Sequence, residues 1–577
     1  MFMIWVRQAS LGFSIKFELF CNNPVNLRFY PSLPLPTGSG KIGSMSEIVL
    51  TTLNAKFIHA AFGLRYLYAN LGTLQPRACL MEFDINQRPL DIAEGLLARN
   101  PKLIGFGVYI WNVTETLEVI TAIRGVRPEV KIVLGGPEVS HETGGQAIVE
   151  WADHVITGEA DLKFAEVCQS LLEPPAGKAK GDSAIFPKII AAELPDFSRI
   201  TLPYEFYSDA DLAHRIVYVE ASRGCPFTCE FCLSSLDIPV RQVPLAIFLG
   251  AMETLLGRGL KQFKFVDRTF NLNVPTSKAI LEFFLERHQP GHFYHFEMVP
   301  DRLPAELRVI IEKFPAGALQ FEVGIQTFNP EVGALISRRQ NYERMADNFN
   351  FLRTQTRVHI HADLIVGLPG ETLESFAAGF DRLIALGPQE IQVGILKRLR
   401  GTPISRHDAA WQMIYSVQPA YEILQNRLLD FSLLQRLRRF AKYWDLIGNS
   451  GNFIRVTPLI GSVSPKVAPR DEAAAESPSP FYSFLRLSDW LYKRLQRTDS
   501  IALMRLLELL FEYLTTEALL DKKLVAETLW EDYQTGGRHD KPSFLKDYLP
   551  ANEAGAGQRA DSGLPKRQAR RLVQPVK

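Results

Sequence analysis

The chain has 577 residues, of which 46% are apolar and 22% charged, values that exclude wholesale disorder, a collagen repeat and a disulfide-rich secreted scaffold. Its 64 Lys and Arg residues balance 63 Asp and Glu residues to a net charge of +1, so the composition does not support binding to nucleic acid or to an anionic membrane. Three of only six cysteines lie between positions 225 and 232, which indicates metal ligation in a reducing compartment. No apolar run approaches the roughly 20 residues that span a bilayer, and we expect a cytoplasmic protein.

The first part of the chain predicts a doubly wound α/β domain over residues 45–172. Residues 1–44 include Pro-rich and Gly-rich text and are expected to be a poorly ordered extension. Short apolar runs then alternate with helical stretches such as 60–71 and 114–126, which is typical of a parallel sheet covered on both faces. The expected strands are 48–51, 79–84, 103–108, 131–135 and 154–157.

A second α/β series over residues 213–404 predicts a partial (β/α) barrel of six strands. It follows a linker, 173–212, whose first half is rich in Pro, Gly, Ala and Lys. Helices are expected between most pairs of strands. The expected strands are 216–221, 262–267, 292–298, 318–324, 359–365 and 390–395.

The remaining text predicts a helical C-terminal domain over residues 405–550. Apolar residues recur at helical spacing over 425–443 and 501–533. The low-complexity stretch 463–480 is expected to be an exposed loop, and the tail 551–577 is expected to be disordered. The basic stretch 436–442 is interpreted as a solvated helix face in preference to an anion site.

The strongest chemical signal is Cys225-Pro-Phe-Thr-Cys229-Glu-Phe-Cys232, directly after the expected strand 216–221. Three cysteines can hold three irons of a [4Fe–4S] cube and leave the fourth iron open for a cofactor or substrate. A zinc site completed by a distant ligand, or a redox pair, is the alternative. Structural zinc normally takes four protein ligands, and the other three cysteines show no ligand spacing, so the cluster is favoured.

With Phe231 before its third cysteine, this motif resembles the signature of the radical S-adenosylmethionine (SAM) superfamily. Two later segments are similar to those of its coproporphyrinogen-dehydrogenase and methylthiotransferase branches. They are Glu322-Val-Gly324-Ile-Gln326, followed by Arg338, and Asp363-Leu-Ile-Val-Gly367-Leu-Pro-Gly370-Glu371. The resemblance implies that the cluster binds SAM, with Phe231 at the adenine and with Glu297, Gln326, Arg338 and Asp363 at the ribose and methionyl groups.

Simple chemistry fits two of these implied roles. Ribose hydroxyls need acceptors such as Asp363, and Arg338 could pair with the methionyl carboxylate. The alternatives are a helix cap or turn for Asp363 and surface ion pairs for Glu297 and Arg338.

The superfamily's glycine-rich segment after the second barrel strand is absent, and Phe265-Val-Asp267-Arg-Thr-Phe-Asn271 stands in its place. That form resembles the cobalamin-binding branch, in which an acidic residue commonly replaces the glycines. Asp267 therefore becomes the candidate for the amino group of SAM.

The N-terminal domain is similar to the cobalamin-binding domains of the same branch. Leu134-Gly135-Gly136-Pro-Glu and the segment ending in Gly158-Glu159 resemble the two turns that such domains present at strand ends. Glycines allow the backbone to approach a flat corrin or its nucleotide tail closely, and Gly135, Gly136, Gly158 and Glu159 are the candidate cobalamin residues. Ordinary strand-to-helix turns are the alternative.

The usual cobalamin motif DxHxxG is absent. The loop after the first strand contains His59 without the Asp that would orient it as an axial ligand. We therefore expect bound cobalamin with no histidine on cobalt, while loss of cobalamin binding is the alternative.

The order of domains resembles an uncharacterised bacterial set of cobalamin-dependent radical SAM proteins with a helical C-terminal domain. The resemblance implies an enzyme that generates a 5′-deoxyadenosyl radical and delivers a methyl group or another radical modification to an unknown substrate. An electron donor such as flavodoxin or ferredoxin is the expected partner. A methylthiotransferase acting on RNA and a non-catalytic cobalamin-binding sensor are the alternatives.

Overall fold

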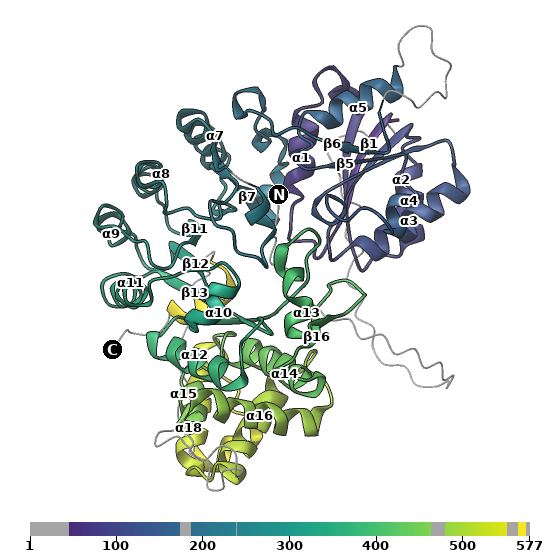
Figure 1. Cartoon of the computed structure of the whole chain (residues 1–577). Helices are drawn as coiled ribbons and strands as arrows, with labels where there is room; N and C mark the ends of the chain where they lie inside the picture. Colours follow the sequence, from purple (N-terminus) through teal and green to yellow (C-terminus); the bar gives the residue numbers. More distant parts are fainter. Residues whose placement is uncertain (1–44, 174–185, 238, 463–478, 551–563, 573–577) are drawn as a thin grey trace. The chain divides into compact units, whose positions relative to one another are not determined.

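The computed structural model describes residues 45–173, 186–237, 239–462, 479–550 and 564–572 (Figure 1). These residues form two compact units that divide between Val217 and Tyr218. The helices among them are all too short or too polar to cross a bilayer. The expected extension 1–44 and most of the expected loop 463–480 lie outside the described residues.

Unit 1, which ends at Val217, is built on a six-stranded parallel sheet in the order β2-β1-β3-β4-β5-β6. The strand order reverses at β1, because β2 lies on one side of it and β3 to β6 follow on the other. Such a reversal places crossover helices on both faces, so the predicted doubly wound fold is confirmed. The strands are β1 (Ile48–Asn54), β2 (Ala78–Asp84), β3 (Leu103–Gly107), β4 (Lys131–Gly135), β5 (His154–Thr157) and β6 (Ile189–Ala191).

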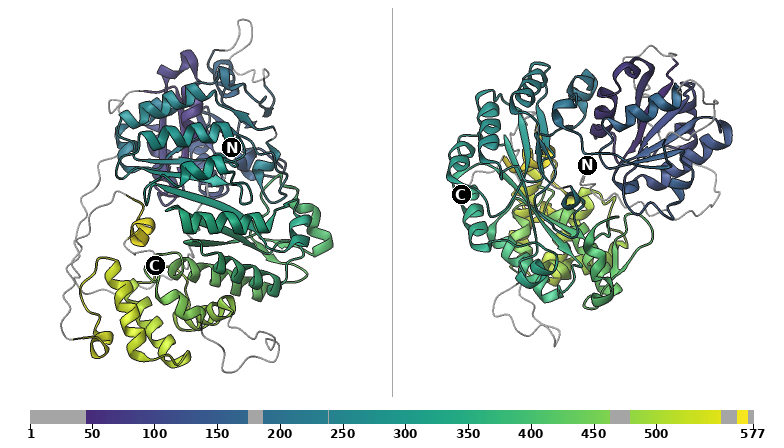
Figure 2. Two further views of the ribbon diagram at one scale, coloured as in Figure 1. Left: turned by 90° about the vertical axis from the view of Figure 1, so that its left-hand side faces the viewer. Right: turned by 45° about the horizontal axis from the view of Figure 1, so that its top comes forward.

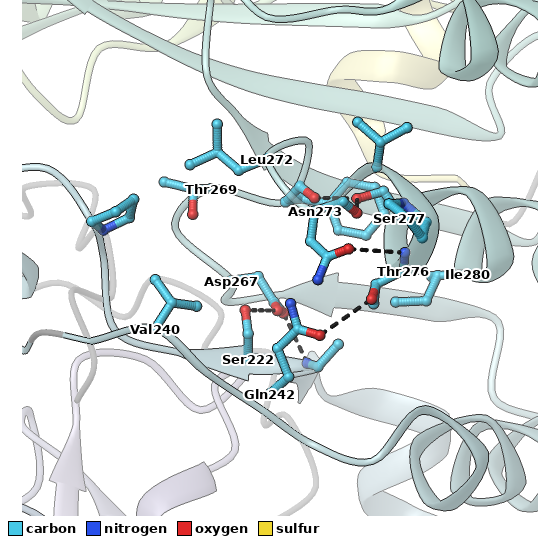
Figure 3. A pocket seen from close by; sticks show the side chains of 15 residues that line it. Ser222, Val240, Gln242, Asp267, Thr269, Leu272, Asn273, Thr276, Ser277 and Ile280 are labelled. Atoms are coloured by element: carbon cyan, nitrogen blue, oxygen red, sulfur yellow. Dashed lines mark hydrogen bonds between the residues drawn. The ribbon is translucent and has the colours of Figure 1, made fainter.

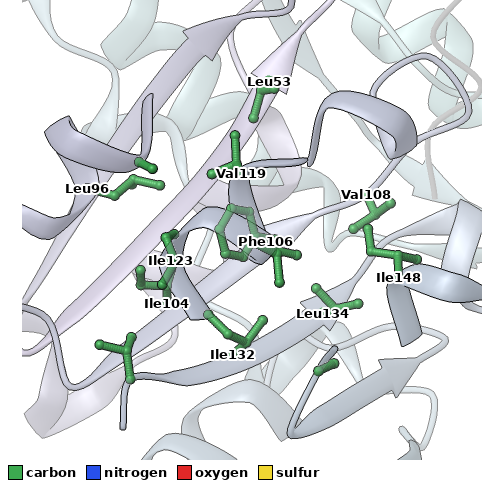
Figure 4. Packing of buried hydrophobic residues seen from close by; sticks show 14 of the residues in the cluster. Leu53, Leu96, Ile104, Phe106, Val108, Val119, Ile123, Ile132, Leu134 and Ile148 are labelled. Atoms are coloured by element: carbon green, nitrogen blue, oxygen red, sulfur yellow. The ribbon is translucent and has the colours of Figure 1, made fainter. Parts of the chain in front are cut away.

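Two hydrophobic cores hold these layers together. On one face, α2 (Pro89–Leu97), α3 (Val113–Val126) and α4 (Ala147–Glu150) pack Leu96, Ile123 and Ile148 against the sheet. Figure 4 shows these side chains around Ile104, Phe106 and Leu134 of the central strands. On the other face, α1 (Phe62–Ala69) and α5 (Lys163–Leu172) cover the sheet with residues such as Leu64 and Phe164.

The region predicted as a linker is structured in its described part. Residues 189–191 form β6, which adds a sixth strand to the five that were predicted. Asp209–His214 forms α6, whose N-cap Ser208 makes a capping box with Asp211. The described part of the predicted linker therefore contains regular structure, because pairing with β5 orders residues 189–191, whose neighbourhood by composition favours a loop.

Unit 2 begins with the expected partial barrel. Its six-stranded sheet has the order β14-β13-β12-β11-β10-β7, and helices follow the strands as crossovers. The strands are β7 (Val217–Val219), β10 (Gln262–Phe265), β11 (Phe293–Met298), β12 (Leu319–Gln326), β13 (His359–Val366) and β14 (Glu390–Ile395). The helices are α7 (Leu245–Gly257), α8 (Val274–Glu286), α9 (Ala305–Ile311), α10 (Pro330–Leu335), α11 (Tyr342–Gln355) and α12 (Leu373–Leu386).

Local signals explain where several of these helices begin and end. Thr372 caps α12 by accepting a hydrogen bond from the Ser375 amide, and Gly387 ends it with a φ of 69°. Asn341 caps α11 through the Arg344 amide in the same way. These are the positions that favour Asn and Thr at the start of a helix and Gly at its end.

The C-terminal region is helical, as predicted, and belongs to unit 2. Phe380 of α12 contacts Phe440 and Trp444 of α14 (Phe431–Ile447) and Phe481 of α16 (Pro480–Leu495), which joins this region to the barrel. The left view of Figure 2 shows the yellow-green helices of this region grouped at one end of the unit. The further helices are α13 (Asp408–Trp411), α15 (Val456–Gly461), α17 (Leu503–Glu512) and α18 (Lys522–Thr535).

Two predictions for this region change. The expected helical stretch 501–533 is two helices, because a π-helical turn at Tyr513–Glu517 ends α17 and Asp521 caps α18. The basic stretch of α14 is engaged within the unit, because Arg436 pairs with Asp489 at 2.7 Å and Arg438 with Glu422 at 3.1 Å.

The tail predicted to be disordered contains helix α19 (Lys566–Leu572). Arg567 of α19 forms ion pairs with Glu390 at 2.9 Å and with Asp445 at 2.8 Å, and Gln568 hydrogen-bonds Gln320. Glu390 and Gln320 stand at the N-terminal ends of β14 and β12, so α19 covers the base of the barrel. The prediction of disorder is wrong for residues 564–572, because buried Glu390 and half-exposed Asp445 order a short basic segment.

Candidate active site

The three cysteines lie on a loop that leaves the hairpin strand β8 (Ser222–Arg223). Gly224 turns the chain with a φ of 93°, and a Cβ there would lie 2.7 Å from the Asp237 carbonyl oxygen. The amide of Cys225 donates to that same carbonyl at 3.0 Å, and the amide of Cys232 donates to the Cys229 carbonyl at 3.1 Å. The loop is thus folded by its own backbone, with Cys225 and Cys229 buried and Cys232 half-buried.

The sulfurs are close enough to affect one another electrostatically. Burial, together with the charges of Cys232 and Cys229, raises the pKa of the Cys225 thiol to about 11, although Arg268 opposes the shift. Burial likewise raises the pKa of Cys232. Arg338 donates from Nη1 to the Cys229 sulfur at 3.4 Å. Cluster irons would stabilise the thiolates that burial disfavours, and two arginines would offset the remaining charge, so the loop fits an iron–sulfur cluster.

No three His, Cys, Asp or Glu side chains in the part of the chain that the structure describes converge on the position of one metal ion. Each cysteine of an iron–sulfur cube binds a separate iron at its own corner, so a cube does not need such convergence.

Gln326 and Arg338, two of the predicted SAM residues, meet at the end of β12. A bulge between Gly324 and Gln326 shifts the register with β13, and Gln326 has the strained φ of 74°. A Cβ on Gly324 would lie 2.6 Å from Gln326 Nε2, so only glycine leaves room for this arrangement. Gln326 Oε1 and Arg338 Nε are buried without a hydrogen-bond partner.

Asp363 follows on the adjoining strand, with its Oδ1 3.3 Å from Nε2 of His361 and without a well-directed hydrogen bond. Buried polar atoms are normally satisfied, so atoms without a partner at the end of a parallel sheet indicate a ligand. These three residues therefore fit a polar cofactor such as SAM.

Glu297 and Phe231 are two further SAM candidates, one on β11 and one in the cysteine loop. Glu297 on β11 pairs with Arg268 Nη1, its two oxygens lying 2.8 and 2.9 Å away. Burial raises the pKa of Glu297, although Arg268 opposes the shift. Phe231 is half-buried between two of the cysteines in the sequence.

Asp267 is placed differently from the other predicted SAM residues. Its carboxylate accepts hydrogen bonds from the Ala221 amide at 3.0 Å and from Ser222 Oγ at 2.6 Å, and burial raises its pKa to about 7. It lines a cavity of about 470 Å³ with Gln242, Asn273 and the first turn of α8 (Figure 3). Asp267 is the one predicted SAM residue among the described residues that line this cavity, and the neighbouring Arg268 pairs with another of them, Glu297.

A layer of charged side chains inside the barrel escaped the sequence analysis. His295 Nε2 lies 2.9 Å from a carboxylate oxygen of Glu322, and Lys264 Nζ lies 4.0 Å from the same oxygen. Although burial disfavours an imidazolium, Asp363 raises the pKa of His361 to about 9. The segment His359-Ile-His361-Ala-Asp363 carried the signal, because residues two apart in a strand share a face and three polar residues on one face imply a polar interior.

The carboxyl edge of the unit 1 sheet carries the predicted cobalamin residues. Ser140 Oγ donates to the Gly136 carbonyl at 2.9 Å and accepts from the Gly158 amide at 3.3 Å, so the turns after β4 and β5 are neighbours. Glu159 is buried beside them. At Gly136, however, a Cβ would lie 2.5 Å from the Val108 carbonyl oxygen, so contact within the protein already requires a glycine there.

Gly135 fits a ligand better. A Cβ on Gly135 would meet no atom nearer than 3.7 Å, so no contact within the described residues demands a glycine. The sequence analysis also missed an aromatic pair at this edge, Tyr109 and Trp111, whose rings stack at 4.4 Å. A glycine backbone and a flat aromatic pair at a strand-end edge fit a large planar ligand such as cobalamin.

The loop after β1 holds His59 through its backbone. The His59 carbonyl accepts from Arg215, and His59 bridges to Ile216 as a parallel pair. Arg215 is held in turn by Glu82 at 2.7 Å, and Glu82 also accepts from Arg65 at 2.9 Å. This buried ion network fixes the loop in which an axial histidine would otherwise be expected.

Comparison with known families accords with this geometry. The model of the B12 binding domain matches residues 48–168, that of the radical SAM superfamily matches 219–383, and that of a protein of unknown function, DUF4080, matches 409–561. The chain therefore combines a B12-binding domain, a radical SAM domain and a DUF4080 region. The predicted family and the predicted cofactors, a [4Fe–4S] cluster, SAM and cobalamin, are confirmed at this level.

Individual relatives are distant. The chain is 24% identical over 310 residues to an uncharacterized methyltransferase of Pyrococcus horikoshii, covering 50% of this chain and 65% of that protein. It is 23% identical over 350 residues to the cobalamin-dependent radical SAM methyltransferase TokK of Streptomyces tokunonensis, covering 53% and 48%. The matches thus span between about half and two thirds of these relatives. The solved structure of the cobalamin-dependent SAM radical enzyme OxsB with aqua-cobalamin shares the fold, with a TM-score of 0.56, 13% identity and coverage of 87% and 84%.

Proposed function

We propose that this protein is a cobalamin-dependent radical SAM methyltransferase. The observation that carries the proposal is the group of buried polar atoms without partners, Gln326 Oε1 and Arg338 Nε, beside the cysteine loop of a chain that also has a B12-binding domain. A purely structural loop would leave no reason for such atoms to stay unsatisfied. The similarity to two methyltransferases, one of Pyrococcus horikoshii and TokK, supports methyl transfer as the reaction.

When bound, the cluster, SAM and cobalamin would supply an electron, a 5′-deoxyadenosyl radical and a transferable methyl group. The chain's own residues would hold and shield these groups. Cys225, Cys229 and Cys232 would ligate three irons, and Arg338 would offset thiolate charge while facing the cofactor. Asp363 would accept from the ribose hydroxyls, with protonated His361 behind it stabilising the carboxylate.

Two alternatives are less well supported. A methylthiotransferase would need three further cysteines in its N-terminal domain for a second cluster, whereas residues 45–172 contain only Cys79 and Cys168. Cys168 is buried, and burial raises the pKa of its thiol, which disfavours ligation. A cobalamin sensor without catalysis would not need the polar groups at the end of β12.

Anaerobic reconstitution tests the proposal. The purified protein should bind about four irons, consistent with a cube, and retain cobalamin, and with a strong reductant it should convert SAM to 5′-deoxyadenosine or S-adenosylhomocysteine. A protein that binds iron and cobalamin but forms neither product would favour the sensor. A second equivalent of cluster would favour the methylthiotransferase.

We further propose a reducing, cytoplasmic location with a flavodoxin or ferredoxin as the electron donor. The proposal rests on the cysteine loop, because thiolate ligands and a low-potential cluster require a reducing compartment.

A further inference from the structure

Glu230 lies between two cysteines of the motif and is 2% exposed. Its carboxylate accepts hydrogen bonds from Ser337 Oγ at 2.6 Å and from His407 Nε2 at 2.9 Å, and it pairs with Arg406. A buried carboxylate with three partners from two distant segments is a costly arrangement that holds those segments in one geometry.

The backbone of Glu230 makes the same two connections. Its amide donates to the Ile336 carbonyl at 3.1 Å, and its carbonyl accepts from the Ile404 amide at 3.0 Å. One residue of the cluster loop is therefore joined by main chain and side chain to residues 336–337 and to residues 404–407.

The first of these segments leads directly to Arg338. Ser337 has the left-handed φ of 56°, a conformation that a serine keeps only when its surroundings determine it. The hydrogen bond from Ser337 to Glu230 is one such restraint. Arg338, the next residue, donates to the Cys229 sulfur, so the segment 337–338 contacts the cysteine loop at both Glu230 and Cys229.

The second segment is the start of the C-terminal region. Pro403–His407 forms a 3₁₀ turn directly before α13, and the DUF4080 match begins at residue 409. Among described residues, this turn thus connects a region of no assigned role to the cluster loop.

We propose that Glu230 is a positioning residue that couples the 403–407 turn to the cluster loop and to Arg338, and so sets both the cluster potential and the affinity for SAM. The inference rests on the proposed function, since it concerns the same cluster. Glu230 and Arg406 act on the cluster with opposite charges. Removal of the Glu230 charge and removal of the Arg406 charge must therefore shift the cluster potential in opposite directions. If each variant only loosened the loop, both would shift the cluster potential in the same direction.

The experiment compares reconstituted wild-type protein with Glu230→Gln and Arg406→Gln by electron paramagnetic resonance during a redox titration. Glu230→Gln should raise the midpoint potential, because a buried negative charge is lost, and Arg406→Gln should lower it. Arg438→Gln, which breaks the comparable pair with Glu422, is the matched control and should leave it unchanged. Shifts of the same sign in both variants, or none, would overturn the proposal.

Ser337→Ala provides a second variant that keeps all charges, in case Glu230→Gln does not fold. It should weaken SAM binding by on the order of tenfold, because it removes one restraint on Arg338. In the protein without cluster, hydrogen exchange of the peptide covering residues 225–237 should also be faster than in wild type. Unchanged SAM affinity and unchanged exchange would refute the coupling. A wild type that binds no cluster would instead refute the proposed function.

Discussion

Glu82 offers a sharp test of how the B12-binding unit is held together. It lies on β2 with its side chain 10% exposed, and it accepts from Arg65 at 2.9 Å, Arg215 at 2.7 Å and Asn54 at 3.1 Å. Although burial disfavours its charge, the two arginines lower the pKa of Glu82 from 4.5 to about 2. Glu82→Gln keeps the shape and removes the charge.

The magnitude follows from linkage. A carboxylate whose pKa falls from 4.5 to about 2 on folding contributes about 3 kcal/mol to stability at pH 7. Because the folded pKa is the lower one, this contribution is complete above pH 4.5 and is lost as the pH falls toward 2. The difference between wild type and Glu82→Gln should therefore be about 3 kcal/mol at pH 7 and about 1 kcal/mol smaller at pH 4.

Hydrogen exchange of peptides from α1 and β2 measures the free energy of opening this unit. Glu94→Gln, which changes an exposed carboxylate on α2, is the control and should have no measurable effect. Cobalamin retention should fall in Glu82→Gln alone, because Arg215 would no longer be fixed against the loop that carries His59. An equal effect of both variants, or a difference that grows at low pH, would refute the reasoning.

Alanine in place of any motif cysteine should abolish the cluster, whereas Cys168→Ala should leave iron content unchanged; full iron in a motif variant would disprove the ligand assignment. Gly136→Ala should lower the thermal unfolding midpoint, because the new Cβ would lie 2.5 Å from the Val108 carbonyl oxygen. Reduced cobalamin binding by that variant would therefore not identify a contact with the ligand. His59→Ala should preserve the Co(II) paramagnetic resonance spectrum, and nitrogen splitting that disappears would reveal an axial histidine. Burial raises the pKa of Asp532 to about 6, so the free energy of unfolding should fall as the pH rises from about 4 to 6 and Asp532 ionises. Urea unfolding of Asp532→Asn should show a weaker dependence of this free energy on pH. An unchanged pH dependence would contradict the reasoning.

Much of the fold was determined by the sequence itself, because its signals are local. The strands β4, β5 and β14 have the predicted bounds, since buried parallel strands are short apolar runs bounded by turns. The cysteine motif is equally local, because three ligands of one cluster lie within eight residues. The alternating polar residues of His359-Ile-His361-Ala-Asp363 are also a local signal, and they indicate a polar barrel interior that the sequence analysis did not predict.

Only the tertiary structure decided the features that depend on distant partners. Residues 189–191 become a strand because β5 offers an edge, and α19 forms because Glu390 and Asp445 lie where its Arg567 reaches both. Asp267 was assigned to SAM by a resemblance to the cobalamin-binding branch, and only the fold shows that its carboxylate accepts from the Ala221 amide and from Ser222. Glu230 had no signal at all, because its role depends on side chains more than 100 residues away that only folding brings to the cluster loop.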